Sequence, residues 1–209
     1  MKLNQLDQVV LNNASQALMK AAAACMDRAT AWGRRKLVEY GELVKLAQIA
    51  PYRLRLADCH LDADPLMVLV AMNVPVPLEL NVDGTLRQSD LAVLGIVYPE
   101  AVVKQPLPGT AFVEVTYPPD VFHPNIAKGP RQQLCLGATM PRGIPLREII
   151  VLSYAALCGQ SVTIDFHDPV GVLNLEACRF FEAHPQALPL TKEPFLCRGT
   201  STHPEAQHA

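Results

Sequence analysis

The chain has 209 residues, of which 50% are hydrophobic and 18% are charged. This composition is typical of a compact folded protein rather than a disordered one, and the length suits one domain with room for an extension. The formal net charge of -2 lacks the concentrated basic excess of nucleic-acid-binding proteins, so we expect no nucleic acid partner. No apolar run reaches the length of a membrane-spanning helix, so we expect no membrane partner either.

The chain contains six cysteines, none of them spaced as a metal-binding pair. It is also too long and too rich in core residues to depend on a framework of disulfide bonds. The first residues, MKLNQ, lack the apolar segment of a signal peptide. We therefore expect a reducing, cytoplasmic setting, with no metal and no cofactor.

The first 50 residues have a helical pattern. Alanine, the best helix former, is dense between positions 14 and 31. Trp32-Gly33 predicts a break between two helices, and Pro51 predicts the end of the second. Residues 3–29 are expected to form a helix that packs either on the core or on another protein. Apolar residues recur at helical spacing in both segments, as in Leu11, Ala14, Leu18 and Ala22, then Leu37, Tyr40, Val44 and Ala47.

Strand patterns follow Pro51. Alternation at 52–56 and apolar runs at 66–72, 91–98 and 111–117 predict four strands, which short links would join into an antiparallel meander. The sequence therefore predicts an α+β fold, with helices before and after the sheet.

Two helices are expected after the strands, at 145–158 and 171–183, joined by a polar loop. Gly159 suits the C-cap of the first of them. The tail from residue 199 has no apolar pattern, so we expect it to be disordered.

One short stretch points to chemistry. It reads Phe122-His123-Pro124-Asn125-Ile126, and ten residues after the asparagine comes Cys135, between Leu134 and Leu136. A lone cysteine is more often a small buried hydrophobe than a nucleophile. Strand alternation, however, would direct Cys135 away from the side taken by its two leucine neighbours.

Together, the His-Pro-Asn turn and the cysteine after it resemble the catalytic stretch of ubiquitin-conjugating enzymes, the thioester carriers of ubiquitin and its relatives. The resemblance covers about the C-terminal three quarters of the chain. It implies the ubiquitin-conjugating fold, with an added N-terminal helix at 1–35, a catalytic domain at 36–198 and a tail at 199–209. It also implies three kinds of partner: an activating enzyme, a ubiquitin-like protein and an acceptor protein.

The resemblance gives roles to three residues. Cys135 would carry the modifier as a thioester. Asn125 would either donate a hydrogen bond to the oxyanion formed on attack or hold the loop by bonds to the backbone. Asp168, directly before a proline, would orient an incoming lysine amine and accept its proton, or would only cap a turn. Asp165 and His167 are nearby alternatives for that last role.

His123 is expected to be structural, since a histidine before proline at a turn usually caps backbone groups. The basic cluster at Arg28, Arg34, Arg35 and Lys36 has two readings. The resemblance implies a docking site for the activating enzyme, whereas a solvated helix face is the commoner explanation of such a cluster.

The sequence departs from the family in three places. The loop 127–133 is about two residues longer than usual, the tryptophan that commonly follows the cysteine is missing, and the N-terminal region is extended. These departures indicate a divergent branch, resembling bacterial members that work with a dedicated activating enzyme.

Two other functions stay open at this point. One is a catalytically inactive scaffold of the same fold, which would bind a ubiquitin-like protein or another partner. The other is a cysteine hydrolase, which would need His123 or His167 as the base beside the thiol.

Overall fold

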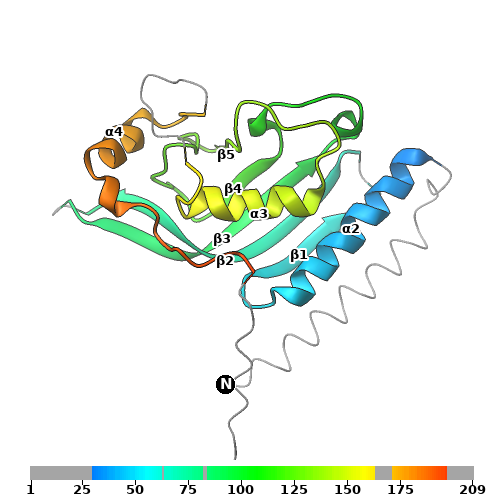
Figure 1. Cartoon of the computed structure of the whole chain (residues 1–209), viewed down its shortest axis with the longest axis horizontal. Coiled ribbons are helices and arrows are strands. Elements are labelled where there is room, and N and C mark those ends of the chain that lie inside the picture. Colours follow the sequence, from blue (N-terminus) through cyan, green and yellow to red (C-terminus); the bar gives the residue numbers. More distant parts are fainter. Residues whose placement is uncertain (1–29, 63, 82–83, 163–170, 197–209) are drawn as a thin grey trace, which may run out of the picture.

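The structure is a computed structural model that describes residues 30–62, 64–81, 84–162 and 171–196. Within them the chain has an α+β fold, in which an antiparallel sheet is covered on one face by helices (Figure 1). The predicted helix at 3–29 and the predicted tail lie outside the described residues. So do Asp168 and its alternatives, Asp165 and His167.

The sheet has five antiparallel strands in sequential order, and the four-stranded meander predicted from the sequence forms its first four members. The fifth strand is short and was not predicted. The strands are β1 (Leu54–His60), β2 (Leu66–Leu80), β3 (Leu86–Tyr98), β4 (Val113–Tyr117) and β5 (Gln132–Leu134).

The β2–β3 hairpin is longer than the apolar runs indicate. β2 continues through Pro75 and Pro77, where the pairing with β3 shifts its register. Proline cannot donate to a strand ladder, so irregularities at these positions let the hairpin continue past them. The extended end of the hairpin reaches toward α4 (Leu175–Ala183) in Figure 1.

Besides α4, the described helices are α2 (Ala31–Ile49) and α3 (Leu146–Leu157). The Thr30 side chain caps α2 by accepting from the Gly33 amide at 2.9 Å, so the predicted break at Trp32-Gly33 falls inside the first turn of one helix. The boundary predicted at residue 35 likewise lies within α2. No helix among the described residues is both long enough and apolar enough to cross a bilayer.

The two later helices match their predictions in part. α3 lies within one residue of its predicted bounds at each end, and Gly159 follows it with a φ of 74°, in the left-handed region that favours glycine after a helix. α4 begins four residues later than expected, because the Asn174 side chain accepts from the Ala177 amide and caps the helix there. Short 3₁₀ turns lie at Glu100–Val103, Gly109–Ala111 and Pro185–Ala187.

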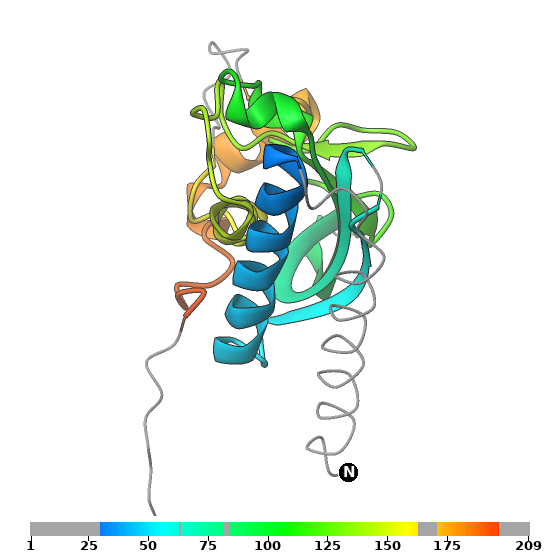
Figure 2. The same ribbon diagram turned by 90° about the vertical axis from the view of Figure 1, so that its right-hand side faces the viewer.

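Both α2 and α3 lie on the same face of the sheet (Figure 2). The inward side chains of β2 and β3 meet the buried side of these helices in one core, in which Leu43, Val70, Leu94, Ile96 and Ile150 are almost fully buried. A smaller cluster joins Phe122 to Ala177 and Phe181 of α4. This second cluster holds α4 against the segment that carries the His-Pro-Asn turn.

A buried carboxylate ties α2 to the start of α3. Glu39 accepts from the Leu146 amide at 2.6 Å and from the Tyr98 hydroxyl at 3.3 Å, and it pairs with Arg35 at 2.5 Å. Arg35 also donates to the Gly143 carbonyl at 3.1 Å. The predicted basic cluster is therefore not a single solvated face, because Arg35 is used inside this network and Lys36 is buried.

Candidate functional site

The cysteine and the His-Pro-Asn turn are neighbours in space. The Cys135 amide donates to the Asn125 carbonyl at 2.8 Å, and Ile126 pairs with Leu134 in an antiparallel bridge. Asn125 is the last residue of the turn, and this bond and bridge place its backbone directly beside that of Cys135. The structure thus brings these two predicted site residues together.

The long loop between them folds into a hairpin instead of separating them. The Ala127 amide donates to the Gln133 carbonyl at 2.9 Å, so residues 128–131 form the tip of the hairpin. β5 is one arm of this hairpin and also pairs with β4. The extra length relative to the resembled family therefore projects from the sheet edge and leaves the distance between Asn125 and Cys135 short.

The Gln132 side chain anchors the hairpin. Its oxygen accepts from the Val121 amide at 2.7 Å, and its nitrogen donates to the carbonyls of Val115 and Pro118 at 3.1 and 2.7 Å. Sequence reasoning missed this residue, because one glutamine inside a polar loop carries no pattern. Lys128 at the hairpin forms an ion pair with Glu176 of α4.

His123 is a structural residue, as predicted. One ring nitrogen, Nε2, lies 2.9 Å from the Ala156 carbonyl, and the other, Nδ1, accepts from the Asn125 amide at 3.1 Å. The ring is neutral in this arrangement, with its proton on Nε2. Complete burial lowers the pKa of His123 to about 4. The imidazole therefore links α3 to the turn and fixes the backbone of Asn125.

The Asn125 side chain is buried, and its amide nitrogen donates to the Gly171 carbonyl at 2.6 Å. The Pro124 carbonyl accepts from the amides of Leu173 and Asn174 at 2.8 and 3.0 Å. These three bonds hold the segment before α4 against the turn. Of the two roles predicted for Asn125, this geometry favours support of the loop.

Gly171 directly follows the segment that contains Asp168. The segment itself lies outside the described residues, so the predicted role of Asp168 stays a prediction. The Asn125–Gly171 bond nevertheless fixes one end of the segment beside the turn.

Cys135 is a free thiol that is 8% exposed. Its sulfur donates to the Gly137 carbonyl at 3.4 Å. Gly137 in turn packs against Gly109, and the Leu136 amide donates to the Gly109 carbonyl at 3.3 Å. The backbone around the thiol is therefore held on both sides, by Asn125 and by Gly109. Sequence reasoning missed Gly109, although its position after Pro108 marks a turn.

The other described cysteines lack this setting. Cys158 and Cys178 are buried, as expected for core residues. Cys59 is half-buried, and burial beside Asp58 and Asp62 raises its pKa to about 12, which disfavours the thiolate. Burial also raises the pKa of Cys158.

Two shallow cavities of about 130 and 510 Å³ flank the hairpin, with Asp120, Gly129 and Gln132 in the walls of both. Cys135 lines neither of them. Within the described residues, no group of three or more acidic, cysteine or histidine side chains is placed to hold a metal ion.

Comparison of the chain with protein-family models, with curated proteins and with solved structures finds no match.

Proposed function

We propose that the protein is a ubiquitin-conjugating-like enzyme that accepts a ubiquitin-like protein as a thioester on Cys135 and transfers it to an amine. The observation that carries this proposal is the 2.8 Å bond from the Cys135 amide to the Asn125 carbonyl. It joins the two halves of the motif in space, although a loop that is long for the family separates them in sequence.

The order of the elements also supports the proposal. The resembled family has a helix, a four-stranded meander, a His-Pro-Asn turn, the cysteine and then helices. The described chain has α2, four antiparallel strands, the turn, Cys135 and then α3 and α4 in the same order. β5, formed by the long loop, is the addition.

The proposed chemistry has two steps. In loading, the Cys135 thiolate attacks the carbonyl carbon of a thioester on the activating enzyme. A new C–S bond forms to Cys135, and the activating enzyme's sulfur leaves and regains a proton. In transfer, an amine attacks the same carbon, a C–N bond forms, and the Cys135 sulfur leaves. The ammonium proton passes to solvent or to a nearby carboxylate, for which Asp168 is the candidate.

The His-Pro-Asn turn would assist both steps by holding the groups around Cys135 in a fixed orientation. Each attack creates a tetrahedral oxyanion beside Cys135, and correct orientation lowers the barrier for both. His123 holds the Asn125 backbone, and the Asn125 amide holds Gly171. Loss of Asn125 would therefore loosen the segment that presents Asp168, even with no direct contact between the Asn125 amide and the oxyanion.

A second candidate is a catalytically inactive scaffold of the same fold. The observation in its favour is the burial of Cys135, whose sulfur is bonded to the Gly137 carbonyl. The Cys135 residue is only 8% exposed, and this burial limits the approach of a macromolecular thioester.

The geometry does not favour a hydrolase that uses His123. Both ring nitrogens are engaged by backbone groups, and the pKa of about 4 leaves the ring a weak base. His167 lies outside the described residues.

The test is incubation with a candidate activating enzyme, ATP and its ubiquitin-like protein, followed by a non-reducing gel. A band that is larger by the mass of the modifier, and that thiol removes, supports the carrier. Cys135→Ala should abolish this band, whereas Cys59→Ala, which removes another incompletely buried thiol, should keep it. An adduct that persists in the Cys135→Ala protein would refute the proposal, and binding of the modifier without any adduct would favour the scaffold.

A further inference from the structure

The outer face of the sheet, the face away from α2 and α3, is apolar at its centre. Met67, Leu69 and Ala71 alternate with the buried residues of β2, and Val93 and Val97 alternate with those of β3. The register places them side by side, because Met67 pairs with Val97 and Ala71 pairs with Val93. We call these five residues the outer apolar patch.

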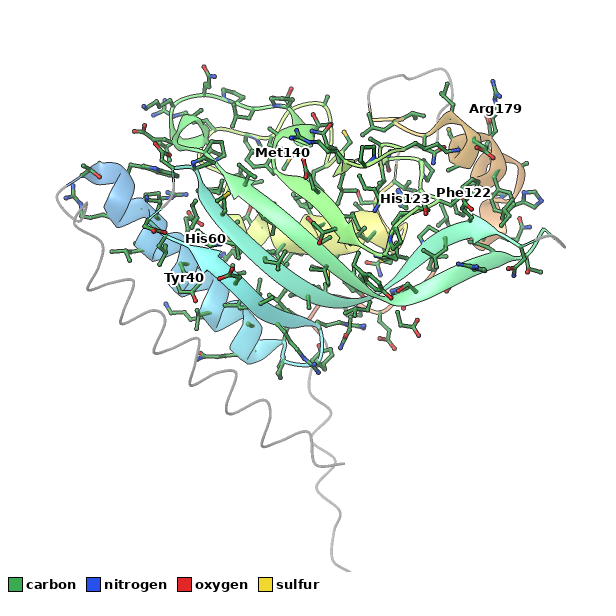
Figure 3. The ribbon with its side chains drawn as sticks, turned by 180° about the vertical axis from the view of Figure 1, so that it is seen from behind. Tyr40, His60, Phe122, His123, Met140 and Arg179 are labelled. Atoms are coloured by element: carbon green, nitrogen blue, oxygen red, sulfur yellow. The ribbon has the colours of Figure 1, made fainter. Side chains whose placement is uncertain are left out.

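An antiparallel sheet with one solvated face normally alternates between apolar and polar residues. Strands that are apolar on both faces are typical of sheets covered on both sides. The described helices all lie away from the outer face, which is turned toward the viewer in Figure 3. Met67 is 40% exposed and Val97 is 37% exposed. The outer apolar patch thus lacks a covering layer among the described residues.

The start of α2 lies at one end of the sheet, close in sequence pairing to part of this patch. Trp32 donates from its indole nitrogen to the Asp64 side chain at 3.3 Å, and its ring stacks on Tyr98 with centroids 6.0 Å apart. Asp64 lies just before β2, and Tyr98 is the last residue of β3. These contacts fix the start of α2 at the end of the sheet where Met67 and Val97 lie.

Residues 3–29 have the pattern of a covering helix. Leu11, Ala14, Leu18 and Ala22 follow one another at spacings of three or four residues and fall on one side of a helix. Leu11, Ala14, Leu18 and Ala22 form an apolar stripe, and the small side chains of its two alanines allow close approach to a sheet. Four polar residues, Asn13, Gln16, Lys20 and Asp27, fall on the opposite side, together with Val9 and Ala23. A helix of this segment would be about 40 Å long, whereas the seven residues of β2 from Met67 to Asn73 span about 20 Å.

We propose that residues 3–29 of the same chain fold back as a helix on the outer apolar patch, with the stripe Leu11, Ala14, Leu18 and Ala22 facing the sheet. The sheet then has a helical layer on each face. This inference concerns a different surface from the Cys135 site and does not depend on the proposed function.

The test measures how fast a maleimide labels a cysteine placed in the patch of the full-length chain. Met67→Cys reports on the patch, and Leu175→Cys reports on an exposed apolar position of α4 away from the sheet. Peptide mass spectrometry separates each introduced cysteine from the native ones. The Leu11→Asp/Leu18→Asp double substitution disrupts the stripe, and Asn13→Asp/Gln16→Asp adds the same charge to the opposite side.

We expect Met67→Cys to be labelled more slowly than Leu175→Cys when the stripe is intact. The stripe substitutions should speed labelling of Met67→Cys by about tenfold or more, because they open the cover. The substitutions on the opposite side should leave that rate unchanged, and none of the variants should alter labelling of Leu175→Cys. Circular dichroism verifies that each variant keeps the folded core.

Two results would overturn the proposal. One is a Met67→Cys rate equal to that of Leu175→Cys with the intact stripe, because the patch would then be open to solvent. The other is protection that disappears on dilution together with a dimeric mass in light scattering, because a second copy would then be the occupant.

Discussion

The backbones of Gly109 and Gly137 touch so closely that a side chain on Gly109 has no space. A Cβ atom added there would lie 2.1 Å from the Gly137 carbonyl oxygen and 2.7 Å from its nitrogen. The same carbonyl accepts the Cys135 thiol. Gly109 therefore sets the position of the backbone that carries the candidate nucleophile.

Gly109→Ala should destabilise the protein by about 1–3 kcal/mol, because backbone atoms must move to admit the methyl group. It should also change the rate at which Cys135 reacts with a small thiol reagent, since the acceptor of the thiol moves. Gly41→Ala is the matched control. It adds the same methyl group to α2 where no atom lies within 4 Å, and it should stabilise the helix by up to about 1 kcal/mol.

Urea unfolding and the alkylation rate of Cys135 measure the two effects. Equal stability for Gly109→Ala and the wild type, with an unchanged alkylation rate, would contradict the close approach of the two glycines.

Glu39→Ala should be among the most destabilising single substitutions in the chain. It removes the acceptor of the Leu146 amide and leaves the Arg35 guanidinium without its buried partner. Breaking one side of a fully buried ion pair costs about 3–5 kcal/mol, and the loss expected here is below that range because the Arg35 side chain is one-third exposed. Glu42→Ala on the same helix removes a surface carboxylate that pairs with Lys45 and Arg147, and it should have little effect. Urea denaturation of both variants measures the difference, and equal losses would refute the role of Glu39 as a buried link.

Stability should fall with acid through His123. Burial lowers the pKa of this ring from 6.5 to about 4 in the folded protein, whereas the unfolded chain titrates near 6.5. Between pH 6.5 and about pH 4 the unfolded state binds more protons than the folded state, so the free energy of unfolding is highest above pH 6.5. It decreases as the pH falls toward 4, by as much as about 3 kcal/mol.

Urea unfolding in steps from neutral pH to about pH 4.5 measures this dependence. His123→Asn should be less stable at neutral pH, because the ring bridges Ala156 and Asn125, but its stability should vary less across this range. His60→Asn is the control for the loss of a histidine side chain as such, because His60 is exposed on β1. A profile for His123→Asn as steep as that of the wild type would assign the acid sensitivity to other groups.

Much of the fold was predictable because local pattern and tertiary structure agree. Pro51 and Gly159 end their helices as proline and glycine normally do, and the apolar runs became β2 and β3. β5 was not predictable, because its residues are polar and it exists only through pairing with β4 and the anchoring bonds of Gln132.

The candidate site was also predictable only in part. The short motif indicated which residues belong to the site and predicted that His123 is structural. The adjacency of Asn125 and Cys135 did not, because it depends on a hairpin register that spacing alone leaves open. The bond from Asn125 to Gly171 joins residues that are 46 positions apart, and no local pattern encodes such a pairing.

Substitutions at Cys135, Asp168 and Asn125 should separate the roles of the three proposed site residues. Cys135→Ser should replace the thioester with a more stable oxyester or abolish the adduct, because a hydroxyl is a poorer nucleophile at neutral pH and its ester is less reactive. Asp168→Ala should slow transfer chiefly at lower pH, where a lysine amine most needs a proton acceptor. Single-turnover discharge of the loaded protein to free lysine, followed against pH, measures both.

Asn125→Ala should slow transfer more than loading, because the Asn125 amide holds the segment next to Asp168 through Gly171. It should also cost about 1–3 kcal/mol of stability, since the Gly171 carbonyl loses a buried donor. Asn73→Ala is the matched control, because the Asn73 amide also donates to a backbone carbonyl at 2.6 Å but on the exposed side of β2.

The double variant tests how Asn125 acts. If Asn125 acts by holding the segment that contains Asp168, the effects of Asn125→Ala and Asp168→Ala on the transfer rate should be strongly non-additive, because both variants lose the contribution of the same carboxylate. Additive losses would instead give Asn125 an independent part in the reaction, as a donor to the oxyanion.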